Sequence, residues 1–192
     1  MHAWSTGAGN CRPAEVRMEI EGPVPNVSSQ CEAILRTLPA WFGIESSILQ
    51  YVRDAAELPT FVVRDAAQIV GFLTLREHFP AAWEVHCIAV RASHRGQGLG
   101  RALHEHVERW LAARGARVLQ VKTMAAIHPS PEYAETREFY AALGYLPLQV
   151  FPLLWGPRLP VLQLVKVLAG FAPERGVYDR PARTLPANER AR

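Results

Sequence analysis

The sequence has few cysteines, no long apolar run and little charge imbalance. Its 192 residues include only Cys11, Cys31 and Cys87, an odd number without CxxC spacing, which argues against a disulfide framework or a zinc knuckle. No stretch reaches the roughly 18 to 20 apolar residues of a membrane span, and no charged segment followed by an apolar run marks a signal peptide. We therefore expect a soluble cytoplasmic protein without a membrane partner.

The charge balance indicates no nucleic-acid surface. Lys and Arg number 21 against 18 Asp and Glu, a formal net charge of +3. Much of the excess lies in residues 169–192, and no basic stripe runs through the rest, so nucleic acid is not an expected partner. Hydrophobic residues at 49% and charged residues at 20% are ordinary values for one globular domain of this length.

The spacing of apolar residues predicts a mixed α/β domain over residues 14–168, after a leader over 1–13 and before a Pro- and Arg-rich tail over 169–192. The predicted order is strand, two helices, three strands, helix, strand, helix and two strands. The predicted strands are 14–21, 60–64, 68–76, 83–90, 117–122, 145–151 and 161–168; the predicted helices are 28–38, 45–57, 132–142 and one from Leu99 to a stop before Gly115.

A glycine cluster, Arg95 to Gly100 with the sequence RGQGLG, lies between a predicted strand and a predicted helix. Glycines let backbone N–H groups converge on an anion at a helix N-terminus, where the helix dipole also favours negative charge. A P-loop would need GK[ST] after the glycines, and a dinucleotide-binding turn would need GxGxxG, whereas the spacing here is GxGxG. The cluster predicts a site for a phosphorylated cofactor, with a plain surface turn as the simpler interpretation.

Two motifs in this order resemble those of the GNAT (GCN5-related N-acetyltransferase) superfamily. The cluster matches that family's RxxGxG signature, and FYAALGY downstream resembles its FYxxxGF motif; the matching residues are Arg95, Gly98, Gly100, Phe139, Tyr140, Gly144 and Tyr145. The resemblance covers about residues 14–168. It implies a mixed, strongly twisted central sheet of about seven strands flanked by about four helices, whose fourth and fifth strands splay apart to admit a pantetheine arm.

The resemblance also implies an activity, transfer of the acetyl group of acetyl-CoA to a primary amine by direct attack in a ternary complex, without a metal. Carried over by position, the backbone of Ile88, Ala89 and Val90 would contact the pantetheine and the acetyl carbonyl. The implied pyrophosphate loop consists of Arg95, Gly96, Gln97, Gly98, Leu99, Gly100 and Arg101. Tyr133 stands where many family members have an Asn that binds pantetheine, and Thr136 is the candidate to replace that contact.

Such chemistry needs a neutral amine. An amine with a pKa near 10.4 is neutral only about once in 2,500 at pH 7, a barrier of roughly 4.6 kcal/mol, so a general base is useful. Strand alternation places Glu84, His86 and Ile88 on one face, and in relatives a glutamate on this strand often takes the proton. Glu84 is therefore the first candidate and His86 the second. Tyr140 is the predicted acid that protonates the leaving thiolate; a salt-bridged carboxylate, a packed histidine and a core aromatic are the structural alternatives.

The identity of the acceptor stays open. Apolar residues suggest a pocket for an amine with an apolar portion, or core and dimer contacts instead: Leu38, Pro39, Trp41, Phe42, Phe151, Leu153, Leu154 and Trp155. A polycation such as an aminoglycoside would need an acidic cleft, which the sequence does not indicate. A small-molecule amine is favoured over a protein as the acceptor. A non-catalytic acyl-CoA-binding regulatory module is the alternative function, and a homodimer is possible. His104 and Glu105 begin an HExxH metal motif, but Glu108 stands where its second histidine belongs.

Overall fold

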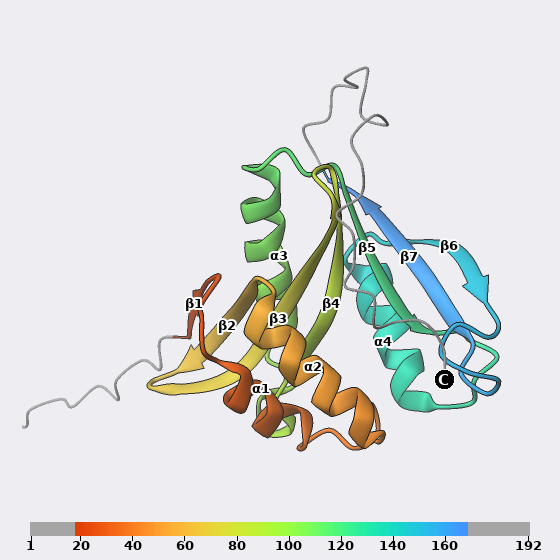
Figure 1. Cartoon of the computed structure of the whole chain (residues 1–192), viewed down its shortest axis with the longest axis horizontal. Helices are drawn as coiled ribbons and strands as arrows, with labels where there is room; N and C mark the ends of the chain where they lie inside the picture. The colour runs from red at the N-terminus through yellow and green to blue at the C-terminus, as the bar shows by residue number, and fades with distance from the viewer. Residues whose placement is uncertain (1–17, 169–192) are drawn as a thin grey trace, which may run out of the picture.

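A computed structural model of the protein describes residues 18–168 (Figure 1). The predicted leader over 1–13, residues 14–17 of the predicted first strand, and the predicted tail over 169–192 lie outside the described residues. In chain order the elements are β1 (Glu19–Glu21), α1 (Ser28–Leu35), α2 (Glu45–Glu57), β2 (Thr60–Asp65), β3 (Gln68–Phe79), β4 (Ala82–Val90), a short 3₁₀ turn (Ala92–His94), α3 (Leu99–Ala112), β5 (Val118–Met124), α4 (Pro131–Ala142), β6 (Leu146–Phe151) and β7 (Val161–Val167).

The strands form one sheet in the order β1-β2-β3-β4-β5-β7-β6. Only β4 and β5 are parallel among its neighbouring strands in the described chain. These two strands pair only where Ala82–Val85 lie beside Val118–Val121, and beyond that point they diverge, as Figure 1 shows. The mixed seven-stranded sheet with four helices, and the splay between its fourth and fifth strands, are therefore confirmed.

A β-bulge stands at the point where β4 leaves β5. The register of β4 against β3 shifts between Val85 and Cys87, so that His86 is an extra residue on β4. Such a residue bends its strand and increases its twist, which accounts for the divergence from β5. The bulge also breaks the alternation predicted from the sequence. Ile88 packs on the same core as Val85, whereas the His86 ring contacts α2, so placing Ile88 on the face of His86 was wrong.

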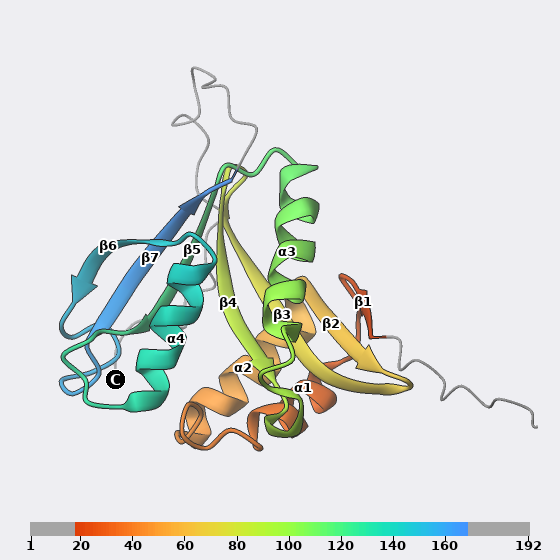
Figure 2. The same ribbon diagram turned by 180° about the vertical axis from the view of Figure 1, so that it is seen from behind.

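Two helices cover each face of the sheet (Figure 1, Figure 2). Buried residues of α1 and α2 pack on one face in a core that includes Cys87 and Ala89. On the opposite face α3 buries Leu99, Leu103, Val107 and Leu111, which matches the helical spacing predicted from the sequence, and α4 contributes Tyr140. The sheet therefore separates two apolar cores, and the splay opens between α2 and α4.

Two predicted boundaries move by three residues. The helix predicted over 28–38 ends at Leu35, where the N–H of Leu38 bonds the Leu35 carbonyl in a tighter turn ahead of Pro39. Proline disfavours helical backbone in the residue before it, so the helix cannot include Leu38, the last residue of the predicted range. The strand predicted over 68–76 continues to Phe79, because β3 and β4 pair as one long hairpin as far as Phe79 and Ala82.

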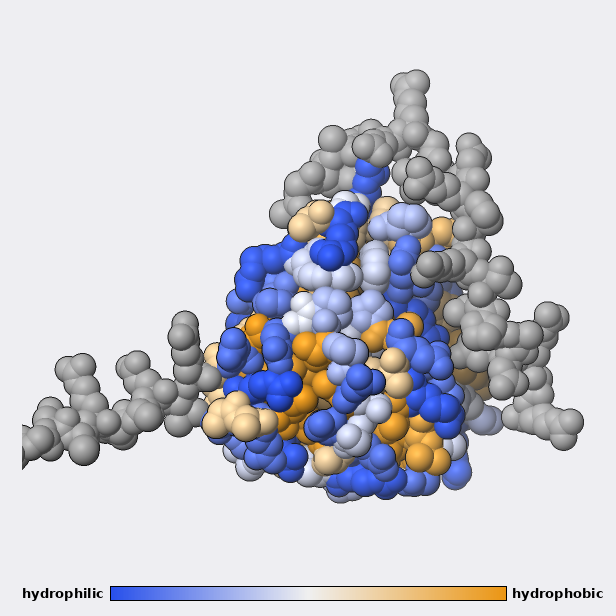
Figure 3. Space-filling model, turned by 60° about the vertical axis from the view of Figure 1, so that its left-hand side comes forward, coloured by the Kyte–Doolittle hydropathy of each residue, from blue (hydrophilic) through white to orange (hydrophobic). Residues whose placement is uncertain are grey.

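The surface is mixed in character. In the face shown in Figure 3, hydrophilic residues border a smaller area of hydrophobic residues in the lower half. At the sheet edge, Leu146, Leu148 and Val150 of β6 are exposed. Within residues 18–168, no helix is both long and apolar enough to cross a membrane. The homodimer and the cytoplasmic location expected from the sequence stay predictions.

Candidate active site

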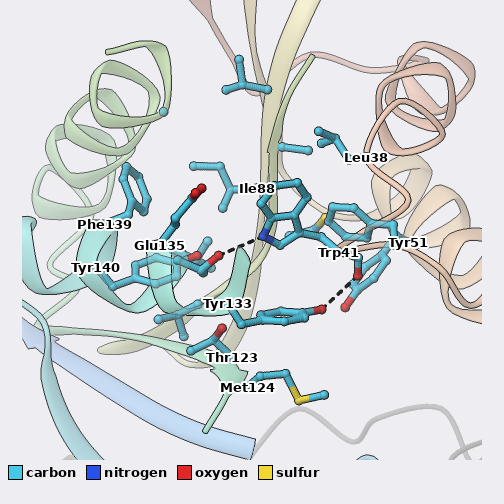
Figure 4. Close-up of a pocket in the computed structure, with 18 of the residues that line it drawn as sticks. Leu38, Trp41, Tyr51, Ile88, Thr123, Met124, Tyr133, Glu135, Phe139 and Tyr140 are labelled. Atoms are coloured by element: carbon cyan, nitrogen blue, oxygen red, sulfur yellow. Dashed lines mark hydrogen bonds between the residues drawn. The ribbon is translucent and has the colours of Figure 1, made fainter. Parts of the chain in front are cut away.

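A cavity of about 750 Å³ lies at the splay between β4 and β5 (Figure 4). Its walls come from the connection between α1 and α2, from β4 and the glycine turn, from the end of β5, from α4 and from the connection between β6 and β7. It gathers most of the residues predicted from the sequence: His86, Ile88, Ala89, Val90, Arg95, Gly96, Gly98, Leu99, Gly100, Arg101, Thr136 and Tyr140. Gln97 and Glu84 are the predicted site residues that do not line it.

The glycine turn forms the entrance to α3. Gly96 and Gly98 have φ values of +76° and +79°, a backbone conformation that residues other than glycine adopt only with strain. Gly98 is the N-cap of α3 and no side chain caps this end, so the first N–H groups of the helix are available to an anion. At Gly100 an added Cβ would lie 3.4 Å from the Phe139 ring, an ordinary van der Waals distance, so α3 and α4 are in contact at this position.

Arg95 sits at the same mouth and contacts two other elements. Its guanidinium lies 4.2 Å from the centroid of the Trp41 ring, and its Nη2 is 3.3 Å from Glu135 Oε2 on α4. The Arg101 guanidinium instead donates to the Ala142 carbonyl at 3.3 Å. Both cations stand beside the uncapped end of α3, where they would add to its attraction for a phosphate.

Glu84, the first candidate for the base, lies outside the cavity and is 6% exposed. Its Oε2 is 2.6 Å from His78 Nε2, 2.7 Å from Lys122 Nζ and 3.0 Å from Gln120 Nε2. Burial disfavours the charged carboxylate, but the hydrogen bond from His78 and the charge of Lys122 outweigh it and lower its pKa from 4.5 to about 2. A carboxylate held so firmly as an anion is a weak proton acceptor.

His86, the second candidate, does line the cavity. Its Nε2 lies 2.6 Å from Asp54 Oδ2 on α2, and because a carboxylate only accepts, Nε2 carries the proton and Nδ1 is the basic nitrogen. Asp54 also accepts from Arg76 at 3.2 Å and from Gln50 at 2.9 Å. Burial works against its charge, but the hydrogen bond from His86 leads the contacts that lower its pKa below the ordinary value.

Asp54 is the partner of His86 that sequence reasoning missed. It stands 32 positions before His86, on a helix whose other charged residues face solvent, so no local motif marks it. Its burial depends on α2 lying across β4, and only the tertiary structure brings the two side chains together.

Tyr140 points into the cavity from α4 (Figure 4) and is 3% exposed. Its ring packs edge-on against Phe139 and Tyr145, at centroid distances of 5.2 and 5.3 Å. Burial raises the pKa of its hydroxyl above the ordinary value, so the group is protonated at neutral pH and can donate. Tyr145 differs, because its hydroxyl lies 2.8 Å from His104 Nε2 and it is not part of the cavity wall.

Trp41 links the α1–α2 connection to α4 across the cavity (Figure 4). Its indole N–H donates to Thr136 Oγ1 at 3.1 Å, and the Tyr133 hydroxyl donates to the Trp41 carbonyl at 2.9 Å. Tyr133, which replaces the family's Asn, thus binds the protein itself in this structure. The pantetheine contact expected of Thr136 stays a prediction, and forming it would require Thr136 to exchange the indole for the ligand.

The residues expected at the acceptor end are partly in place. Leu38, Trp41, Phe42 and Trp155 line the cavity, whereas Pro39, Phe151, Leu153 and Leu154 do not. Tyr51, Lys122 and Thr123 are among the residues of the wall that were not foreseen from the sequence. The Thr123 hydroxyl is buried without a hydrogen-bond partner among the described residues, so a polar group of a bound molecule would complete its hydrogen bonding.

Comparison with known proteins agrees with this geometry. The family model described as "Acetyltransferase (GNAT) family" matches residues 29–145, and no curated protein matches the chain significantly. A GNAT-family protein from Desulfovibrio desulfuricans superposes with a TM-score of 0.71 at 16% identity, covering 80% of this chain and 100% of that one. The ribosomal-protein-S18-alanine N-acetyltransferase of Escherichia coli gives 0.66 at 20%, covering 83% and 98%. An aminoglycoside 6'-N-acetyltransferase solved with coenzyme A gives 0.64 at 21%, covering 81% and 100%.

Proposed function

Because the chain belongs to the acetyltransferase (GNAT) family, we propose that it transfers the acetyl group of acetyl-CoA to a primary amine by direct attack in a ternary complex. The observation that carries this proposal is the single cavity that joins the uncapped glycine turn of α3 to His86 and Tyr140 at the splay. The coenzyme A bound to a protein of the same fold supports acetyl-CoA as the donor.

The donor would lie along the splay. Its pyrophosphate would accept from the first N–H groups of α3, between Gly96 and Arg101. Past Val85 the β5-facing edge of β4 has no strand beside it, so backbone groups of Ile88–Val90 on that edge can pair with the amides of the pantetheine arm. Both contacts would direct the thioester toward Tyr140.

Proton transfer would then involve two side chains of the same cavity. We assign the base to His86, whose Nδ1 takes the proton that the amine must lose while Asp54 holds the imidazole in place. The amine nitrogen attacks the thioester carbonyl carbon, the carbon–sulfur bond breaks, and Tyr140 gives its proton to the departing thiolate. Glu84, the first candidate from the sequence, is replaced in this proposal because it is buried against Lys122 outside the cavity.

The test measures acetyl-CoA binding by calorimetry and thiol release with a panel of amines. We expect His86→Gln to lower kcat by roughly 100-fold or more, the usual contribution of a general base, with acetyl-CoA affinity unchanged. His78→Gln is the matched control, because His78 bonds Glu84 and does not line the cavity; it should leave kcat within a few-fold.

Two outcomes would contradict the proposal. Absence of acetyl-CoA binding would contradict the proposal that acetyl-CoA is the donor. Tight binding without amine-dependent thiol release for any acceptor would indicate a non-catalytic acyl-CoA-binding regulatory module instead.

A further inference from the structure

One wall of the cavity is aromatic, and it runs from Trp41, which stacks on Arg95 beside the glycine turn, to Tyr51 beside His86. Its rings come from four separate parts of the chain: Trp41, Phe42, Tyr51, Tyr133 and Trp155. Phe42 and Tyr51 meet edge to face with centroids 5.8 Å apart, and the Tyr51 ring lies 5.4 Å from that of His86. Figure 4 shows Trp41, Tyr51 and Tyr133 grouped on the side of the cavity opposite Phe139. The surface next to the assigned base is therefore built from flat, apolar rings.

The described lining of the cavity offers little negative charge to a cation. Among the described residues that line the cavity, Glu135 is the only carboxylate, and it pairs with Arg95 at the donor end. The two nearby acids, Asp54 and Glu84, are buried behind the wall and bonded to Arg76 and Lys122. Lys122 itself lines the cavity, where its ammonium is the cation that pairs with the buried Glu84.

These two features select the acceptor by charge and shape. Aromatic faces attract one ammonium group, which is the reacting amine itself, and they stack on an aromatic ring. A second ammonium would lose its hydration without gaining a carboxylate, and would face Lys122. A polycation is therefore excluded by the same wall that favours an aromatic ring.

We propose that the acceptor is an aromatic monoamine, a primary amine on a short chain attached to an aromatic ring, with no second cationic group. This inference rests on the proposed function and names the substrate class of that site. An aminoglycoside 6'-N-acetyltransferase shares the fold, yet the cavity of this protein lacks the acidic lining that an aminoglycoside would need.

The test compares phenethylamine, hexylamine, spermidine and kanamycin as acceptors. Binding of each amine to the CoA-loaded protein is measured by calorimetry, and turnover with acetyl-CoA is measured separately. We expect phenethylamine to exceed spermidine and kanamycin by 100-fold or more in kcat/KM and to bind more tightly than hexylamine. Phenethylamine binding without turnover would refute the proposed function and leave the acceptor site standing. Failure of phenethylamine to bind, or tighter binding of spermidine or kanamycin, would overturn the inference.

Two variants test the two features on which this inference rests, the aromatic rings and the charge of Lys122. Phe42→Leu keeps an apolar group and removes a ring, so KM for phenethylamine should rise roughly 5-fold more than KM for hexylamine does. Lys122→Gln removes the cation of the wall, so kcat/KM for spermidine relative to phenethylamine should rise roughly tenfold. Lys166→Gln is the matched control, because Lys166 is bonded to Glu108 and does not line the cavity. An unchanged ratio in Lys122→Gln, or an equal change in Lys166→Gln, would contradict the charge argument.

Discussion

Replacing Glu84 by Gln separates a structural role of this carboxylate from a catalytic one. The side chain is buried and accepts from His78, Gln120 and Lys122. A change of one in pKa corresponds to about 1.4 kcal/mol, so the fall from 4.5 to about 2 corresponds to roughly 3 kcal/mol of stability at neutral pH. We expect Glu84→Gln to lose roughly 2 to 3 kcal/mol, or about 5 to 10 °C in Tm for a protein of this size.

The sign of the pH dependence follows from the direction of the pKa change. Because the folded pKa lies below the unfolded one, the contribution is complete above pH 4.5 and is lost as the pH falls toward 2. The free energy of unfolding, measured by urea denaturation from pH 7 downward, should therefore fall more steeply in the wild type than in Glu84→Gln. The two curves should converge near pH 2.

The kcat of Glu84→Gln distinguishes a structural role of this carboxylate from a catalytic one. Because Glu84 does not line the cavity, we expect kcat of the folded variant to stay within about threefold of wild type. A 100-fold fall in kcat with unchanged stability would refute this reasoning and would make Glu84 the base, as the sequence first predicted.

Two further predictions concern the donor site and the acid. Gly98→Ala should weaken acetyl-CoA binding, measured by calorimetry, roughly tenfold, because its Cβ would enter the phosphate turn. Gly115→Ala is the control: Gly115 has a φ of +76° and equally open surroundings, so this variant should carry the same backbone strain and leave the affinity unchanged. Tyr140→Phe should lower kcat by 100-fold or more with acetyl-CoA affinity retained, whereas Tyr145→Phe should cost about 1 kcal/mol of stability through its bond to His104 and leave kcat unchanged. Unchanged turnover in Tyr140→Phe would remove the acid role.

Local patterns were sufficient for the fold and for the glycine turn. The apolar spacing of α3 is visible in the sequence because a helix repeats every 3.6 residues. Gly96 and Gly98 likewise indicate a turn with positive φ. The register shift at His86 has no such signature. It depends on how β4 pairs with β3, and it moved Ile88 away from the face predicted for it.

The roles of the charged side chains were decided by distant contacts. Glu84 and His86 are equivalent as a sequence pattern, two ionisable residues on one strand. Packing of α2 across β4 gives His86 a carboxylate partner and a place in the cavity, while Lys122 on β5 neutralises Glu84 behind its wall. The sequence by itself therefore determined the class of the protein and its glycine turn, since both depend on short-range spacing. Only the tertiary structure decided which ionisable side chain of β4 lines the cavity, because burial and charge pairing arise between segments far apart in the chain.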